Sequence, residues 1–175
     1  MDRARLAEDL EALNVKLGGQ RDRERHLESE QDEIEKRILQ AQVETDVAAM
    51  GLSTQGFIWP LNGGVTSPYG SRWGGMHTGI DIDGFSGQPI VASKAGNIIY
   101  ASPSMSGYGN AIIIDHGGGL STLYAHMSEY ELTGGFVDQG KIIGYVGCTG
   151  NCYGDHLHFE VRANGSPVDP MRYLP

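Results

Sequence analysis

The first 50 residues contain no aromatic side chain and only two of the chain's 26 glycines, Gly18 and Gly19. All 4 Phe, 2 Trp and 8 Tyr residues lie in the rest of the chain. A segment of about 50 residues without aromatics cannot build a globular core alone, whereas about 125 residues can. The composition therefore predicts a helical coiled-coil segment over residues 1–50 and one globular domain over residues 51–175.

Basic side chains are also scarce, because 13 Lys and Arg residues face 22 Asp and Glu residues and the net charge is −9. An acidic chain without a basic stripe lacks the footprint needed to bind nucleic acid or anionic lipid. No window approaches the roughly 18 apolar residues of a membrane-spanning helix, and the first thirty residues lack the apolar core of a secretory signal. We expect no nucleic acid partner and no membrane span in this chain. If the protein is exported, we expect its export signal to be absent from this chain.

A heptad pattern runs through residues 1–50, where leucine recurs in steps of four and three from Leu6 to Leu17. The register continues to Ala48, although polar residues occupy its middle. Apolar seam positions favour a partner helix, whereas the Gly18-Gly19 pair disfavours helical continuity. A hairpin of two helices and one helix kinked at the glycines both fit. The segment is either a solvated spacer or a coiled coil that pairs with a helical partner, self-associates or restricts access to the following domain.

After a loop at residues 51–56 the pattern changes to short apolar or alternating runs separated by glycine. Six of these runs are predicted to be strands: Pro89–Ser93, Asn97–Ala101, Ala111–Asp115, Leu120–His126, Lys141–Val146 and His156–Arg162. Consecutive strands with short connections form hairpins, so we expect a mainly β domain with an antiparallel sheet. In the last strand, apolar residues alternate with His156 and His158, which predicts one face in a core and one face presenting imidazoles.

Five of the six histidines fall in the strand-rich part of the chain. The side chains of His156 and His158 point the same way from one strand, with Cα atoms about 6.5 Å apart. His77 and Asp81 would be about 13 Å apart on a straight strand, so they can share a metal only if the chain bends, and Gly79 lies between them. For His116, in a glycine-rich turn, a structural role is favoured.

Catalytic zinc takes three ligands from His, Asp or Glu and leaves a fourth position for water. Two histidines and one aspartate would meet that count, and a zinc-bound water could attack an amide carbonyl at neutral pH. Histidines that do not bind the metal are then candidates for moving protons or stabilising an oxyanion. Spacing alone leaves open whether His156 or His158 is the ligand.

Several separated motifs together resemble the lysostaphin-type zinc endopeptidases, which cut peptide bonds in bacterial peptidoglycan. The matching segments are His77-x-x-x-Asp81, Tyr124-Ala125-His126 and Gly154-Asp155-His156-Leu157-His158-Phe159-Glu160-Val161, with flanking similarity at Ser67–Arg72, Gly109-Asn110 and Gly144–Gly147. The resemblance covers about residues 57–175.

The resemblance implies that His77, Asp81 and His158 are ligands of one zinc ion and that His126 and His156 are the catalytic pair. It further implies an antiparallel β domain with a groove for an extended peptide and an extracytoplasmic location in the periplasm, at the cell surface or in secreted form. Because some relatives are inactive regulators that have lost these residues and all five are present here, we expect an active enzyme. We assign Tyr69, Trp73 and Asn110 to the substrate groove as candidates, although core packing is the alternative for the aromatic residues.

Cys148 and Cys152 lie directly before the His-x-His strand. A disulfide between them would suit an oxidising compartment and make the rim of the site rigid. The alternative is a closed zinc site formed by both cysteines with His156 and His158. We favour the disulfide, because the closed site leaves His77, Asp81 and His126 unexplained.

Two other functions compete with the zinc endopeptidase. The first is a non-catalytic cell-wall binding module that keeps the fold and uses its coil to activate a partner amidase. The second is a domain with a structural zinc built on the cysteines. The filled set of five site positions favours the enzyme.

Overall fold

The computed structural model of the chain describes residues 3–72 and 74–175. By its contacts the chain divides into two compact units, one ending at residue 41 and one beginning at residue 42. Helix α1 (Arg3–Met50) belongs to both sides of that division, and the strands begin at Val65. The domain boundary near residue 50 stays a prediction.

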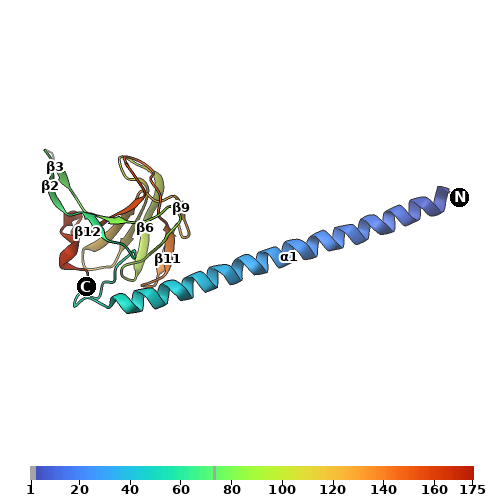
Figure 1. Ribbon diagram of the computed structural model, residues 1–175, viewed down its shortest axis with the longest axis horizontal. Coiled ribbons are helices and arrows are strands. Elements are labelled where there is room, and N and C mark those ends of the chain that lie inside the picture. The colour runs from blue at the N-terminus through green and yellow to red at the C-terminus, as the bar shows by residue number, and fades with distance from the viewer. Residues whose placement is uncertain (1–2, 73) are drawn as a thin grey trace. The chain divides into compact units, whose positions relative to one another are not determined.

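Helix α1 is one uninterrupted helix that contains Gly18 and Gly19 in its interior (Figure 1). Of the two alternatives that the sequence leaves open, this excludes the hairpin at the glycine pair. Each glycine costs about 1 kcal/mol relative to alanine, but it keeps its backbone N–H and does not end a helix by itself. The flanking residues are mostly Leu, Glu, Lys, Arg and Gln, which are good helix formers and carry the helix across the pair.

The hydrophobic seam of α1 is exposed to solvent. Its large apolar side chains are between 42% and 62% exposed: Leu10, Leu13, Leu17, Leu27, Ile34 and Ile38. No helix in the described residues is long and apolar enough to cross a membrane. Pairing of α1 with another helix stays a prediction.

The strands of the β domain are β1 (Val65–Ser67), β2 (Gly70–Arg72), β3 (Gly75–His77), β4 (Ile80–Asp83), β5 (Pro89–Val91), β6 (Gly96–Met105), β7 (Gly109–Asp115), β8 (Leu120–Ala125), β9 (Glu129–Tyr130), β10 (Gly135–Val137), β11 (Ile142–Tyr145), β12 (His156–Ala163) and β13 (Ser166–Val168). A 3-10 turn, η1 (Pro170–Arg172), follows them.

The strands form one large antiparallel sheet with smaller sheets beside it. The order in the eight-stranded sheet is β1-β4-β12-β8-β7-β6-β10, and β13 pairs with the end of β12. A second sheet has the order β5-β11-β9, and β2 pairs with β3. Every pairing is antiparallel. The predicted fold class, an antiparallel β domain preceded by a helical segment, is confirmed.

One face of the large sheet carries the main core. Leu157, Phe159 and Val161 of β12 are fully buried there, together with Ile80 and Ile82 of β4. The alternation in β12 then directs His156 and His158 to the opposite face, as the sequence predicts. The site is thus built on the second face of a rigid, well-packed sheet.

All six predicted strands are present, with ends that differ by a few residues. The sequence pattern does not predict the other seven strands of the described residues, which include β4, the strand that carries Asp81. With four residues, β4 is too short for its alternation to be distinguished from a loop, and it is defined by its pairing with β1 and β12.

Gly79 makes the bend between β3 and β4, where the backbone passes very close to β12. A Cβ atom at Gly79 would lie 2.3 Å from the Phe159 carbonyl oxygen. We therefore expect Gly79→Ala to lower the free energy of unfolding by at least about 2 kcal/mol, because backbone must move to relieve the overlap. Urea unfolding measures this loss. Gly134→Ala is the matched control, since its Cβ would meet nothing within 4 Å, and an equal effect of the two changes would contradict the prediction.

Candidate active site

Residues distant in the sequence meet in one row across three neighbouring strands. His158 of β12 lies opposite Asp81 of β4 on one side and opposite Ala125 of β8 on the other. His126 directly follows Ala125 and has a φ of 63°. This left-handed conformation ends β8 and is uncommon for residues other than glycine. The sheet register therefore brings the predicted site residues together.

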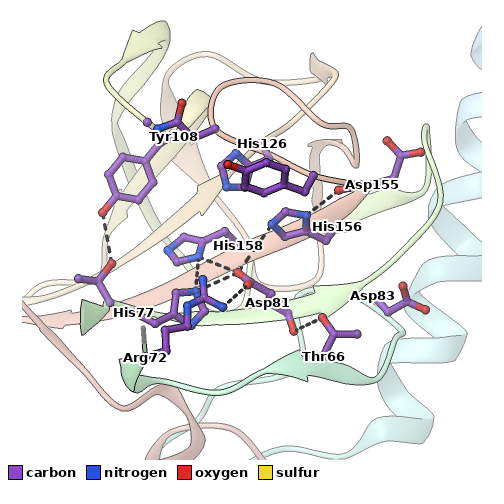
Figure 2. A pocket seen from close by; sticks show the side chains of 15 residues that line it. Thr66, Arg72, His77, Asp81, Asp83, Tyr108, His126, Asp155, His156 and His158 are labelled. Carbon is purple, nitrogen blue, oxygen red and sulfur yellow. Dashed lines mark hydrogen bonds and ion pairs between the residues drawn. The ribbon is translucent and has the colours of Figure 1, made fainter. Parts of the chain in front are cut away.

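His77, Asp81 and His158 point their ligand atoms at one another, as Figure 2 shows. His77 Nε2 lies 3.0 Å from Asp81 Oδ1 and 3.1 Å from His158 Nδ1, and His158 Nδ1 lies 2.9 Å from Asp81 Oδ1. Both histidines are buried. The bend at Gly79, which the sequence required for His77 and Asp81 to meet, is present.

The other ring nitrogen of each histidine in this cluster donates a hydrogen bond. His77 Nδ1 donates to the Pro68 carbonyl oxygen at 2.8 Å, and His158 Nε2 donates to Glu160 Oε1 at 3.1 Å. Because those oxygens can only accept, His77 presents Nε2 and His158 presents Nδ1 as the nitrogen with a free electron pair in the neutral ring. This arrangement is typical of histidines that bind a metal.

The cluster fits a zinc ion. Two imidazoles and one carboxylate are the donor types of catalytic zinc sites, and ligands about 2.1 Å from a tetrahedral ion lie about 3.4 Å apart. The three atoms need to separate by only a few tenths of an ångström to accept the ion. Burial alone would raise the pKa of Asp81, but the hydrogen bond and charge of His158 lower it to about 2. Asp81 is therefore ionised and ready to bind a cation.

Glu160 is a fully buried carboxylate that supports His158. Besides His158, its partners are Tyr108 Oη at 2.7 Å, Arg162 Nε at 2.6 Å and the Thr78 hydroxyl. Burial would raise the pKa of Glu160, yet these hydrogen bonds, that of His158 foremost, lower the pKa to about 2. Glu160 is thus a permanent negative charge that accepts the His158 Nε2 proton.

We expect Glu160→Gln to weaken zinc binding by about 10-fold, because a neutral amide polarises His158 less than a carboxylate does. Competition with a fluorescent zinc chelator measures the affinity. The matched control is Glu131→Gln, which neutralises a carboxylate that accepts a hydrogen bond from Tyr145 Oη at 3.0 Å. Glu131 does not line the pocket that contains His77, Asp81 and His158. Equal zinc affinity in the two variants would contradict the role of Glu160.

His126 and His156 form a second pair beside the cluster, with ring centroids 4.8 Å apart (Figure 2). His126 Nδ1 donates to the Thr149 carbonyl oxygen at 2.7 Å, and His156 Nδ1 donates to the Gly154 carbonyl oxygen at 2.7 Å. In their neutral forms both rings then accept protons at Nε2. His156 Nε2 lies 3.7 Å from Asp81 Oδ1, so this nitrogen faces the ligand cluster.

The electrostatics favour a neutral His126. Burial lowers the pKa of His126, and the neighbouring His156 and His158 lower it further, against an opposing hydrogen bond to Thr149. In contrast, although burial lowers the pKa of His158, its bonds to Asp81 and Glu160 raise it overall. His126 is therefore suited to act as a base near neutral pH.

One pocket is lined by all five predicted ligand and catalytic residues, which are His77, Asp81, His126, His156 and His158. Its other lining residues are Thr66, Arg72, Thr78, Asp83, Gly107, Tyr108, Asn151, Tyr153, Gly154 and Asp155. Arg72 Nη1 lies 3.5 Å from Asp81 Oδ2, the carboxylate oxygen that the histidines do not contact. The pocket thus combines two tyrosine side chains with charged and hydrogen-bonding groups.

Two of the three candidate groove residues, Tyr69 and Asn110, lie outside this pocket. Tyr69 packs against the core and donates from Oη to the Pro167 carbonyl oxygen at 3.3 Å. The Asn110 side chain donates to the Ser128 carbonyl oxygen at 3.2 Å. Neither lines this pocket, and Trp73 lies outside the described residues. Their contact with a substrate stays a prediction.

A disulfide joins Cys148 and Cys152. With their sulfurs bonded to each other, the two cysteines do not form the alternative closed zinc site. His116 is also separate from the pocket, because its ring nitrogens contact the Ala95 carbonyl oxygen and the Thr122 hydroxyl.

Sequence reasoning gave no role to Arg72 or Glu160. Glu160 could have been found, since it lies two residues after His158 on one strand and so shares its face. Arg72 gives no such signal, because β2 pairs with β3 and not with β4, so its approach to Asp81 depends on how two separate sheets lie in three dimensions.

Comparison with known proteins gives one family. The family model described as peptidase family M23 matches residues 75–170. A DD-carboxypeptidase/endopeptidase Mpg of Neisseria meningitidis serogroup B is 44% identical over 114 residues, which is 61% of this chain and 26% of that protein. The murein hydrolase activator NlpD of Salmonella dublin is 42% identical over 122 residues, 67% of this chain and 31% of that protein.

The fold is similar to that of a solved peptidase domain. The catalytic domain of the antimicrobial peptidase lysostaphin from Staphylococcus simulans aligns with a TM-score of 0.59 and 34% identity, covering 64% of this chain and 92% of that one. The chain spans about a quarter to a third of the length of the two curated relatives described above.

Proposed function

Because the chain belongs to peptidase family M23, we propose that its β domain is a zinc-dependent endopeptidase that hydrolyses peptide bonds in bacterial peptidoglycan, in stem-peptide crosslinks or bridges. The observation that carries this proposal is the triangle of ligand atoms from His77, Asp81 and His158, with edges of 2.9–3.1 Å, beside two histidines of fixed tautomer.

His77 Nε2, Asp81 Oδ1 and His158 Nδ1 would hold one zinc ion. Bound zinc supplies Lewis acidity that polarises a carbonyl group and lowers the pKa of water to about 7. His126 and His156 accept and return protons at Nε2. One takes a proton from the attacking water and passes it to the leaving amide nitrogen, and the other, when it carries a proton from solvent, stabilises the developing oxyanion. The products are a carboxylate and an amine.

Support for the substrate class comes from the relatives, whose names describe a DD-carboxypeptidase/endopeptidase, an activator of murein hydrolases and an antimicrobial peptidase. We place the protein outside the cytoplasm, in the periplasm, at the cell surface or in secreted form, where peptidoglycan is found and a disulfide such as Cys148–Cys152 persists.

The test is release of soluble peptide from purified peptidoglycan. We expect release by the zinc-loaded protein, loss of release after a chelator removes the metal, and recovery when zinc is added back. Release that continues at the same rate after complete zinc removal would overturn the proposal.

The similarity to the activator NlpD favours a second candidate, a non-catalytic module that binds cell wall and activates a partner amidase. The two candidates differ in a purified system. The module would bind peptidoglycan without cleaving it and would accelerate an added amidase, whereas the enzyme cleaves alone.

We further propose that residues 1–50 pair with a helical partner or restrict access to the pocket, because the seam of α1 is exposed. If the segment restricts access, a chain that begins at Gly51 releases peptide faster than the full chain. Equal rates for the two proteins would exclude restriction and leave pairing, which sedimentation velocity of the full chain with and without candidate helical partners tests.

A further inference from the structure

The two histidines of the proposed catalytic pair are held by one short segment. His126 Nδ1 donates to the carbonyl oxygen of Thr149, which lies inside the ring closed by the Cys148–Cys152 disulfide. His156 Nδ1 donates to the carbonyl oxygen of Gly154, two residues after Cys152. His126, which directly follows β8, and His156, which begins β12, thus depend on the same ten-residue connection between β11 and β12.

A carbonyl acceptor at Nδ1 fixes both the tautomer and the orientation of an imidazole. The oxygen can only accept, so the proton resides on Nδ1 and the electron pair of the neutral ring on Nε2. The same bond stops the ring from turning about its Cβ–Cγ bond. If the Thr149 carbonyl turned away, His126 could present either nitrogen to the pocket, and one of the two tautomers would be unable to act as a base at Nε2.

The backbone around Thr149 fits tightly against its neighbours. Thr149 N donates to the His126 carbonyl oxygen at 3.4 Å, while Asn110 N donates to Thr149 Oγ1 at 2.9 Å. Asn151 N donates to the Gly107 carbonyl oxygen at 2.8 Å. A Cβ atom at Gly109 would lie 2.4 Å from the Thr149 carbonyl carbon, so the segment can approach only because that position is glycine.

The sequence of the segment itself is permissive. Gly150 has a φ of 74°, and Thr149 and Asn151 flank it, so the chain offers many conformations besides the observed one. The disulfide brings the Cα atoms of Cys148 and Cys152 to 5.2 Å and limits the segment between them. Cys148 is exposed, and Cys152 Sγ lies 3.6 Å from His156 Nδ1. Of the two carbonyls that hold the rings, that of Thr149 therefore lies inside the covalent ring and that of Gly154 lies two residues beyond it.

We propose that the disulfide-closed segment 148–152 is the positioning element of the pair, fixing the ring orientation and Nδ1–H tautomer of His126 and, through residues 153–155, of His156. Its effect on catalysis rests on the proposed function, whereas its effect on the rings does not. Neither cysteine is among the ligand cluster of His77, Asp81 and His158, so opening the disulfide leaves metal binding intact.

The test compares the zinc-loaded full chain with Cys148→Ser/Cys152→Ser. We expect equal zinc content, a kcat for peptide release that is about 10- to 100-fold lower and a KM that changes little, because misplacing a reacting group by about 1 Å has an effect of that size. Nitrogen-15 NMR of the imidazoles should show a single Nδ1–H tautomer for His126 and His156 in the wild type and mixed tautomers in the variant.

Reduction of the folded wild-type protein by a phosphine, with zinc in excess, makes the same comparison without a substitution and covers the case of a variant that does not fold. The double variant has no disulfide to reduce, so the phosphine should not change its kcat. This control excludes removal of the metal by the phosphine. The proposal would be overturned if the double variant or the reduced protein kept the wild-type tautomers at both rings and a kcat within twofold of the wild type. Absence of peptide release by the wild type would count against the proposed function instead, while the NMR result would still decide the positioning claim.

Discussion

His77→Ala is expected to abolish both zinc binding and peptide release. The substitution removes one of three ligand atoms and leaves Asp81 and His158, which cannot hold the ion in a defined geometry. Because loss of even an indirect contact to a metal ligand weakens zinc binding by about 10- to 100-fold, removal of a direct ligand should weaken it by more than about 100-fold. Elemental analysis after dialysis and release of peptide from peptidoglycan measure the two effects.

The matched control for this change is His26→Ala. His26 lies on α1, its side chain is 74% exposed, and its ring lies 3.5 Å from the Glu30 carboxylate. This variant should keep one zinc ion per chain and the wild-type rate. Zinc retained at wild-type stoichiometry in His77→Ala would show that the ion binds at another place.

Substitution of His126 should separate the two effects, because zinc is retained while peptide release is lost. His126 is not part of the ligand cluster, and the centroid of its ring lies 4.8 Å from that of His156. Loss of a general acid or base lowers kcat by about 10²- to 10⁴-fold. Both His126→Ala and His126→Asn should show this loss, measured as kcat for peptide release alongside zinc content.

His126→Asn is the more informative of the two variants. The backbone at His126 has a φ of 63°, a conformation that asparagine adopts more readily than alanine. We expect His126→Ala to have a lower thermal stability than His126→Asn and the same loss of kcat. This result would show that the loss of kcat comes from the missing imidazole and not from backbone strain. Wild-type kcat in His126→Asn would remove His126 from the mechanism.

The sequence predicts which histidines come together, but it does not predict the groups that contact them. The spacing of His156 and His158 on an alternating strand places both on one face, and Gly79 between His77 and Asp81 allows the required bend. Which histidine binds the metal could not be derived from spacing. The hydrogen bond from His158 Nε2 to Glu160, which leaves Nδ1 directed at Asp81, is the observation on which our proposal of His158 as the ligand rests.

Three features of the molecule could not be predicted from the sequence, for physical reasons. The Gly18-Gly19 pair suggested a break, but local propensity is weak compared with the combined preference of a 48-residue helix. The tautomers of His126 and His156 depend on carbonyl groups of a loop, and a sequence pattern contains no information about where a backbone carbonyl points. Similarly, Tyr69 and Asn110 adjoin site motifs in the sequence but make their hydrogen bonds outside the pocket.

The most direct test of the central claim is mass spectrometry of peptidoglycan fragments after incubation with the purified, zinc-loaded protein. A zinc endopeptidase should add one water to each cleaved bond, producing new peptide amino and carboxyl ends while the glycan strands remain intact. His126→Asn with its zinc retained should produce none of these ends. Peptidoglycan that stays uncut by the zinc-loaded wild-type protein, while an added amidase is accelerated, would contradict the account and favour the activating module.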